Sequence, residues 1–329
     1  MRILLPPSEA KTPGGDGPAL RVTGFGDGPI AAARIEVAQA VAAFCHRDPA
    51  TAIVALRLPA SRAETDLATN AAILDAPTMP ALDRFAGVLY EALAAATMPP
   101  AARAVADRAL FVSNGAFGLV NAAEPVPDHR VGMAAAVPGL GGRATPTVLA
   151  TFWRTRLARF LPDLLVCAPT PAAGAPAAAP ESLTATPPAE AAVGEHLIVD
   201  LRSSAYATVP TLSGPIRSSA LPVRALTEKL LDGHWVRRPL SYQAKQTKGL
   251  LARALLLADA AGRPVKTVDD VAEAAESAGL VAEPRGTAAA PTLDVITRWD
   301  PAGRYGGKTP RSLVAAARAA GHLDANAAR

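Results

Sequence analysis

Apolar residues recur at intervals of three and four along several stretches of the chain. This spacing puts them on one face of a helix and is typical of amphipathic helices. It predicts helices over residues 30–44, 81–95, 147–161, 241–257 and 268–278. Thr267 is the expected N-cap of the last helix, because a hydroxyl there accepts from the free backbone N–H groups of the first turn.

Short aliphatic runs predict β-strands. Residues 2–5 and 110–113 are two of them. Residues 197–201, with the sequence LIVDL, form the nearly continuous apolar run expected of a central strand covered on both faces. Asn114 and Gly115 predict a turn after the second run, where glycine takes a positive φ at little cost. These elements indicate an α/β fold, with a mixed sheet and surrounding helices.

One internal segment differs sharply in composition from the rest. Residues 169–194 consist almost entirely of Ala, Pro, Thr and Glu. So few large apolar side chains cannot bury enough surface to offset the ordering entropy. We expect a disordered surface insertion, with a linker between two independent domains as the alternative. Residues 309–329 predict a terminal helix and a frayed tail.

Composition excludes several protein classes. The 329 residues are 50% hydrophobic but only 4% aromatic, so Ala, Val and Leu must fill the core. Cys45 and Cys167 are too few for a disulfide framework or a four-thiolate zinc site. Only three consecutive aliphatic residues precede Pro6 and Pro7, too few for a signal peptide or a membrane span. We expect a soluble, cytoplasmic protein that needs no metal or cofactor and binds no membrane.

The distribution of charge indicates a polyanionic partner. The net charge is only +4, but residues 201–263 hold ten Lys or Arg against three acidic residues. A local excess of this size is a candidate footprint for nucleic acid, nucleotide or phosphate.

The helix over 241–257 carries the most informative part of this excess. Lys245, Lys248, Gly249 and Arg253 fall on the side opposite its leucine stripe, which we expect to be exposed. Lysine supplies a mobile charge, arginine a planar fork, and glycine lets a backbone phosphate approach closely. An ordinary solvated helix face fits the same spacing equally well.

Other candidate residues are less specific. Lys11 follows the first strand, where ligands of open α/β folds bind, although its position alone is typical of an exposed loop lysine. Ser8 and Lys11 have Ser-x-x-Lys spacing without the partner motifs of lactamases. Neither a dinucleotide-binding fingerprint nor a P-loop is present in the sequence. Asp200 ends a strand and could serve as a base, but no second carboxylate is identifiable beside it.

Five separated segments together resemble the YaaA family of peroxide stress proteins. They are RILLPPSEAKT, LFVSNGAFGLVNAAEPVPDHRVGM, the Phe152-Trp153 pair, LIVDLRSSAYATV and AKQTKGLLARALL. Each is weak alone, but their order and approximate spacing agree with the family over most of residues 1–300.

This resemblance implies a single α/β domain over residues 1–304, with a positively charged cleft and a helix-hairpin-helix-like element. Residues 305–329 would be a C-terminal extension. It also implies a DNA-binding protein that limits oxidative damage by lowering available iron. The positions that match the family's motifs are Lys11, Arg130, Ser203, Tyr206, Lys245, Lys248 and Gly249. Lys248 stands where many members have arginine, and Ala205 replaces an acidic residue.

Three hypotheses about function follow. The first is a stress protein that binds double-stranded or structured DNA through backbone and shape, because phosphate contacts position a protein without specifying a sequence. The second is an enzyme that acts on a phosphorylated small molecule or nucleic acid in a basic cleft. The third is a scaffold whose basic face is merely solvated.

Overall fold

The computed structural model describes residues 1–27, 30–143, 145–166, 196–231 and 234–299. The expected insertion at 169–194 and the extension at 305–329 lie outside these residues. No helix of the described part is long and apolar enough to cross a membrane.

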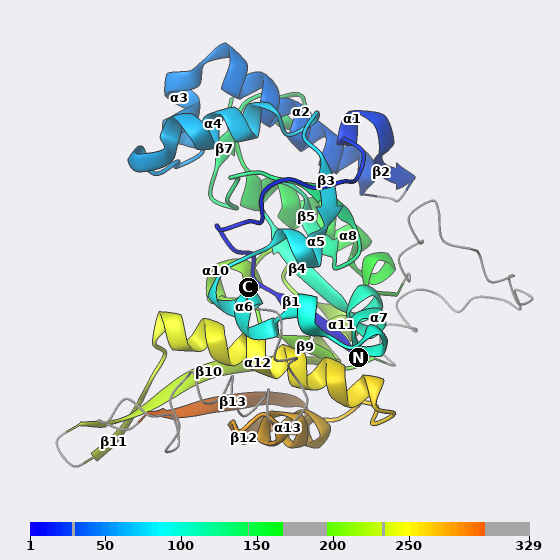
Figure 1. Ribbon diagram of the computed structural model, residues 1–329, viewed down its shortest axis with the longest axis vertical. Helices are drawn as coiled ribbons and strands as arrows, with labels where there is room; N and C mark the ends of the chain where they lie inside the picture. The colour runs from blue at the N-terminus through cyan, green and yellow to red at the C-terminus, as the bar shows by residue number, and fades with distance from the viewer. Residues whose placement is uncertain (28–29, 144, 167–195, 232–233, 300–329) are drawn as a thin grey trace, which may run out of the picture.

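A mixed sheet forms the centre of the molecule, with the strand order β12-β13-β10-β9-β1-β4-β5 (Figure 1). Its middle strands are parallel: β4 (Leu110–Asn114), β1 (Arg2–Leu5), β9 (Ile198–Asp200), β10 (Ala220–Leu231) and β13 (Ala290–Trp299). Antiparallel partners follow at the edges: β5 (Gly118–Asn121) on β4, β12 (Val281–Thr287) on β13 and β11 (His234–Arg238) on β10. The expected α/β class and mixed sheet are confirmed.

Helices surround this sheet. At one end of the molecule lie α2 (Ala31–Arg47), α3 (Pro49–Ala55) and α4 (Ala63–Ala71); α12 (Ser241–Ala260) and α13 (Val268–Ser277) lie at the other (Figure 1). Between them lie α6 (Val88–Leu93) and α7 (Pro100–Ala109), which pack on α12, and α8 (Leu149–Val166). The shorter elements are α1 (Leu20–Thr23), β2 (Gly24–Asp27), β3 (Thr78–Pro80), α5 (Ala81–Arg84), β6 (Pro125–Pro127), β7 (Ala136–Val137), β8 (Thr147–Val148), α10 (Ser204–Ala207) and α11 (Gly214–Ser218), with 3-10 turns at Ala60–Arg62, Ala95–Thr97 and Leu140–Gly142.

The core is aliphatic, as the composition predicts. Ile3, Leu4 and Leu5 of β1 are completely buried, because β1 lies inside the sheet with layers on both faces. Trp153 of α8 is the largest fully buried side chain, and its indole N–H donates to Gly115 O at 2.7 Å. This bond satisfies the polar atom that a buried tryptophan brings with it.

Four of the five predicted helices are confirmed, with ends that differ by a few residues. Thr267 is indeed an N-cap: its hydroxyl accepts from Asp270 N at 3.2 Å, while the Asp270 carboxylate accepts from Thr267 N at 2.8 Å. This reciprocal pair is a capping box.

The single helix expected over 81–95 is wrong, because it divides into α5 and α6. Residues 85 and 86 instead pair with the loop that follows β1: Phe85 forms a β-bridge with Lys11, and Ala86 N donates to Ala10 O at 3.1 Å. Gly87 then takes φ 93°, a conformation that favours glycine. This break fixes the position of the Lys11 loop.

The strands predicted near residues 2, 110 and 197 are confirmed. The reason for glycine at position 115, however, differs from the predicted one. Gly115 does not adopt the expected positive φ. A Cβ at this position would lie 2.4 Å from Val131 O, so glycine is required by close backbone packing. The four strands β10 to β13 were not anticipated from the sequence.

Candidate functional site

Three loops meet where the parallel strands β1, β4 and β9 end, the edge at which ligands bind in open α/β sheets. Residues 6–14 follow β1, and residues 201–206 follow β9. The third segment, residues 128–133, lies against the end of β4, where Asn114 Nδ2 is 3.0 Å from His129 Nε2. Lys11, Arg130, Tyr206 and Lys248 gather along this edge, which we call the cationic edge.

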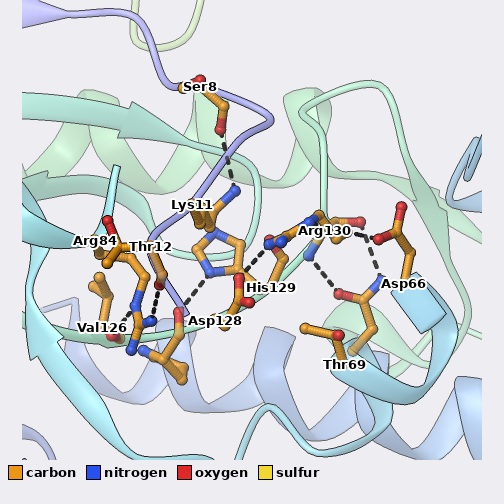
Figure 2. Close-up of polar contacts among 12 residues, drawn as sticks. Ser8, Lys11, Thr12, Asp66, Thr69, Arg84, Val126, Asp128, His129 and Arg130 are labelled. Carbon is orange, nitrogen blue, oxygen red and sulfur yellow. Dashed lines mark hydrogen bonds and ion pairs between the residues drawn. The ribbon is translucent and has the colours of Figure 1, made fainter. Parts of the chain in front are cut away.

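Arg84 fixes the Lys11 loop in place. Its guanidinium is completely buried and donates to four backbone carbonyls, those of Thr12, Gly14 (2.7 Å), Pro77 (3.1 Å) and Val126 (3.2 Å). Figure 2 shows the contacts with Thr12 and Val126. A buried charge is tolerated only where its donors are satisfied, as they are here. Arg84 therefore ties the loop to β6 and adds positive charge beneath Lys11.

Lys11 is half-buried, contrary to the exposed loop lysine that its position suggests. Its Nζ donates to Ser8 O at 3.1 Å (Figure 2) and lies 5.4 Å from the centre of the Phe85 ring. Burial, reinforced by the charge of Arg130, lowers the pKa of Lys11 to about 7, although Asp128 and Glu9 oppose the shift. Lys11 is therefore about half protonated near neutral pH.

His129 beside Lys11 is fully buried and neutral. Its Nδ1 lies 2.9 Å from the Pro127 carbonyl, which can only accept, so Nδ1 carries the proton. Its Nε2 then accepts from the Asn114 amide. Burial, together with the charge of Lys11, lowers the pKa of His129 well below its usual value. The histidine therefore orients the end of β4 rather than supplying charge.

Arg130 connects the cationic edge to helix α4. Its Nη1 donates to Asp128 and to its neighbour's carbonyl, His129 O, at 3.0 Å, and its Nε lies 3.6 Å from the buried Asp66 carboxylate (Figure 2). Asn70 of α4 accepts from Arg130 N at 2.6 Å and donates to Arg130 O at 3.1 Å. Nε of Arg130 has no hydrogen-bond partner in the described part of the chain.

The loop after β9 closes the other side of the edge. Tyr206 is half-buried, and burial raises its pKa, while a hydrogen bond with the Met133 backbone lowers it and the charge of Glu9 raises it further. Tyr206 is therefore close to both the Lys11 loop and the 128–133 segment. Ser203 is exposed at the start of α10.

Asp200 is already paired, which removes the sequence-based suggestion that it is a free base. Arg202 Nε donates to Asp200 Oδ1 at 2.9 Å, and Arg202 Nη2 donates to Oδ2 at 2.8 Å. This bidentate geometry is the strong form of an arginine–carboxylate pair.

Lys248 reaches the same loop from α12. Its Nζ donates to Arg202 O at 3.2 Å, and burial lowers its pKa although the charge of Asp200 opposes that shift. Lys245, one turn earlier on α12, is exposed. Of the lysines of the predicted basic helix, Lys248 therefore contacts the cationic edge, whereas Lys245 faces solvent.

The expected exposure of Gly249 and Arg253 is wrong. A Cβ on Gly249 would lie 2.1 Å from Leu89 O, because α12 and α6 touch at this glycine. Arg253 is only 3% exposed and donates to Leu93 O at 2.9 Å, Ala94 O at 2.8 Å and Thr97 O at 3.2 Å. The first two carbonyls end α6 and the third ends the 3-10 turn that follows it, and such terminal carbonyls need donors. Arg253 therefore joins α12 to the end of α6 and does not face solvent.

Sequence reasoning missed Arg84 and the position of His129. Arg84 lies inside a predicted helix, and nothing in the sequence marks it as a residue that binds backbone carbonyls of other segments. The run Asp128-His129-Arg130 was the available signal, because three polar residues follow one another there between Pro127 and Val131. The assembled edge offers two amines and one guanidinium, a combination suited to anionic oxygens such as those of phosphate.

Comparisons with known proteins agree with the resemblance seen in the sequence. The family described as peroxide stress protein YaaA matches residues 1–283. A UPF0246 protein of Corynebacterium efficiens is 32% identical over 283 residues, covering 86% of this chain and 95% of that protein. A UPF0246 protein of Streptomyces coelicolor is 30% identical over 256 residues, covering 78% and 83%.

Proposed function

Because the chain belongs to the YaaA family of peroxide stress proteins, we propose that it serves the peroxide stress response by binding DNA. The ligand groups would be backbone phosphates of double-stranded or structured DNA, without base specificity. The helix-hairpin-helix-like element and the limitation of iron-dependent damage, both implied by the family, belong to this proposal.

One observation carries the proposal: cations from three distant segments gather at the carboxyl ends of β1, β4 and β9. Lys11 comes from the loop after β1, Arg130 from the segment beside β4, and Lys248 from α12. Cations gathered from so far apart in sequence would attract an anion together more strongly than separate solvated charges do. The phosphates of a DNA backbone would supply several anions to such a group of cations.

The proposal also gives a physical role to the burial of Lys11 and Lys248. Desolvation lowers the pKa of both Lys11 and Lys248, so the protein itself disfavours their charged forms. A phosphate beside them would restore the charged form through an opposite charge. DNA binding should therefore take up protons near neutral pH.

Thermal unfolding in the presence and absence of DNA tests the proposal. A ligand that binds only the native state raises the unfolding midpoint. We expect excess duplex DNA to raise the midpoint of the wild-type protein, and Lys248→Met to reduce that shift. Lys266→Met is the matched control, because Lys266 is exposed and lies near Met1, at the opposite edge of the sheet. No shift with duplex, bulged or single-stranded DNA would overturn the proposal.

A second candidate function rests on Lys11 alone. An amine whose pKa is about 7 can act as a general base or nucleophile at neutral pH. This favours an enzyme acting on a phosphorylated small molecule or nucleic acid. In the thermal experiment, a midpoint raised by mononucleotides or sugar phosphates but not by DNA would select this candidate.

A further inference from the structure

Lys11 differs from the arginines of the site in its contacts. Lys248 resembles it in donating to a single carbonyl, Arg202 O, but the charges of Arg130 and Arg84 also lower the pKa of Lys11. Arg84 donates to four carbonyls, and Arg130 lies against Asp66 and Asp128. Lys11 Nζ donates to a single carbonyl, Ser8 O, and no carboxylate of the described residues is within ion-pair distance of it. One hydrogen bond therefore holds the amine of Lys11 in place, but no ion pair within the described part of the chain neutralises its charge.

The surroundings of Lys11 keep this amine partly uncharged. Arg84 and Arg130 are its nearest cations, and both disfavour a third positive charge. Burial acts in the same direction and is the larger effect. A recessed amine with a free lone pair, next to guanidinium groups, is the arrangement that forms imines with carbonyl compounds.

We propose that Lys11 Nζ forms an imine with an aldehyde carried on a phosphorylated sugar, such as the ring-opened deoxyribose of an abasic site in DNA. The inference rests on the proposed binding of phosphate at the cationic edge. The aldehyde supplies the electrophile, and the neighbouring phosphate is the group that Arg130 and Lys248 would attract. A free sugar phosphate has the same chemistry and is distinguished by the experiment below.

The reaction balances without any further reactant. The neutral amine of Lys11 attacks the aldehyde carbon, and the carbonyl oxygen takes up a proton to give a carbinolamine. Loss of this hydroxyl as water leaves a carbon–nitrogen double bond between Nζ and the sugar. The net change is one amine and one aldehyde converted to one imine and one water, so no oxidant or metal is required.

The chain offers few competing amines. The sequence contains six lysines, namely Lys11, Lys229, Lys245, Lys248, Lys266 and Lys308, besides the α-amine of Met1. Lys248 and Met1 are the rivals in chemical terms, because burial lowers the pKa of both amines. Met1 precedes β1 and so lies at the opposite edge of the sheet from Lys11. Lys248 lies on α12 at the same edge, so the position of the adduct must distinguish it from Lys11.

Borohydride trapping tests the inference on the full chain. The protein is incubated at pH 7 with a duplex that holds one abasic site, in the presence of sodium cyanoborohydride, which reduces an imine to a stable amine. A parallel arm uses free deoxyribose 5-phosphate. Binding is measured separately with a duplex holding a tetrahydrofuran analogue, which has no aldehyde. Mass spectrometry locates any adduct.

We expect one adduct per chain, attached to Lys11, with a yield at least tenfold lower in Lys11→Arg and Lys11→Met. Lys266→Arg, at an exposed lysine outside the cationic edge, should retain trapping at Lys11. Should Lys11→Met fail to fold, the position of the adduct in the wild-type protein and the Lys11→Arg variant decide the matter. Trapping by the abasic duplex alone identifies DNA as the source of the aldehyde, and trapping by the free sugar phosphate alone identifies the small molecule.

Three outcomes overturn the inference. An adduct at Met1 or at another lysine would assign the chemistry elsewhere, as would undiminished trapping in Lys11→Arg. Binding of the tetrahydrofuran duplex without any trapping would leave the proposed DNA binding intact and refute the imine. Failure of both binding and trapping would refute both proposals.

Discussion

Lys11 shows how the fold changes the chemistry of a single side chain. The same amine would have a pKa of 10.5 in an unfolded chain, and burial lowers that pKa to about 7. The loop that surrounds it is held by Arg84 and by pairing with Phe85, so contacts of the folded chain keep the amine out of solvent. Its consequence can be measured in the stability of the protein.

The stability of the wild-type protein should rise with pH from about 7 towards 10, through Lys11. Over this window the unfolded chain binds more protons than the folded one, because the folded pKa of Lys11 is the lower. The free energy of unfolding should gain up to about 1.4 kcal/mol per pH unit from this group. Urea unfolding at pH 7, 8 and 9 measures it.

Lys11→Met is the control for this prediction, since it removes the titrating amine and keeps the length of the side chain. Its free energy of unfolding should rise less steeply with pH than that of the wild-type protein. Parallel curves for the two proteins would mean that Lys11 titrates normally, and that its amine is hydrated in solution.

The apolar pattern of helix α12 predicts the surroundings of one of its sides but not of the other. The leucine stripe predicts the helix and its buried side, and both are found. The opposite side is divided: Lys245 is exposed, whereas Gly249 and Arg253 meet α6. Nothing in the spacing of α12 reveals this second contact, because it depends on where α6 begins and ends.

Gly249→Ala should destabilise the protein by about 1–3 kcal/mol, the usual cost of overpacking. The added methyl would lie 2.1 Å from Leu89 O and 2.8 Å from Ala92 Cβ, and the first of these is backbone that cannot move aside easily. Helix propensity alone predicts the opposite sign, a gain of about 1 kcal/mol. Urea unfolding of Gly249→Ala and of the wild-type protein shows whether the free energy of unfolding falls or rises.

Gly132→Ala is the matched control for that substitution. Its φ is not positive, and an added Cβ would meet no atom within 4 Å, so its free energy of unfolding should change little. If Gly249→Ala were neutral or stabilising while this control behaved as expected, the close contact between α12 and α6 would be wrong.

Local pattern predicted most helices because their apolar faces repeat within a few residues. The break between α5 and α6 could not be predicted, because Phe85 and Ala86 pair with residues more than seventy positions earlier. Strand β12 was missed for a related reason: its side chains are mostly exposed or half-buried, so it has no continuous apolar run. Non-local pairing defines both features.

At the scale of the whole molecule, the cationic edge is a product of topology. The parallel pairing of β1 with β4 and β9 brings the loops after β1 and β9 to the end of β4, where residues 128–133 lie. The sequence singled out Lys11 and Lys248, and the family resemblance added Arg130 and Tyr206. Their convergence and burial required the three-dimensional arrangement, and so did the separation of Arg253 from them.

The salt dependence of DNA affinity tests the central claim most directly. Each phosphate neutralised by a protein cation contributes about −0.9 to the slope of log affinity against log salt concentration. In Lys11→Met/Lys245→Met/Lys248→Met, measured at pH 6.5 where Lys11 is largely charged, the slope should be shallower by roughly 2 to 3 than in the wild-type protein. Lys266→Met should leave it unchanged. Equal slopes in the triple variant and the wild-type protein would contradict a DNA-binding role for the cationic edge.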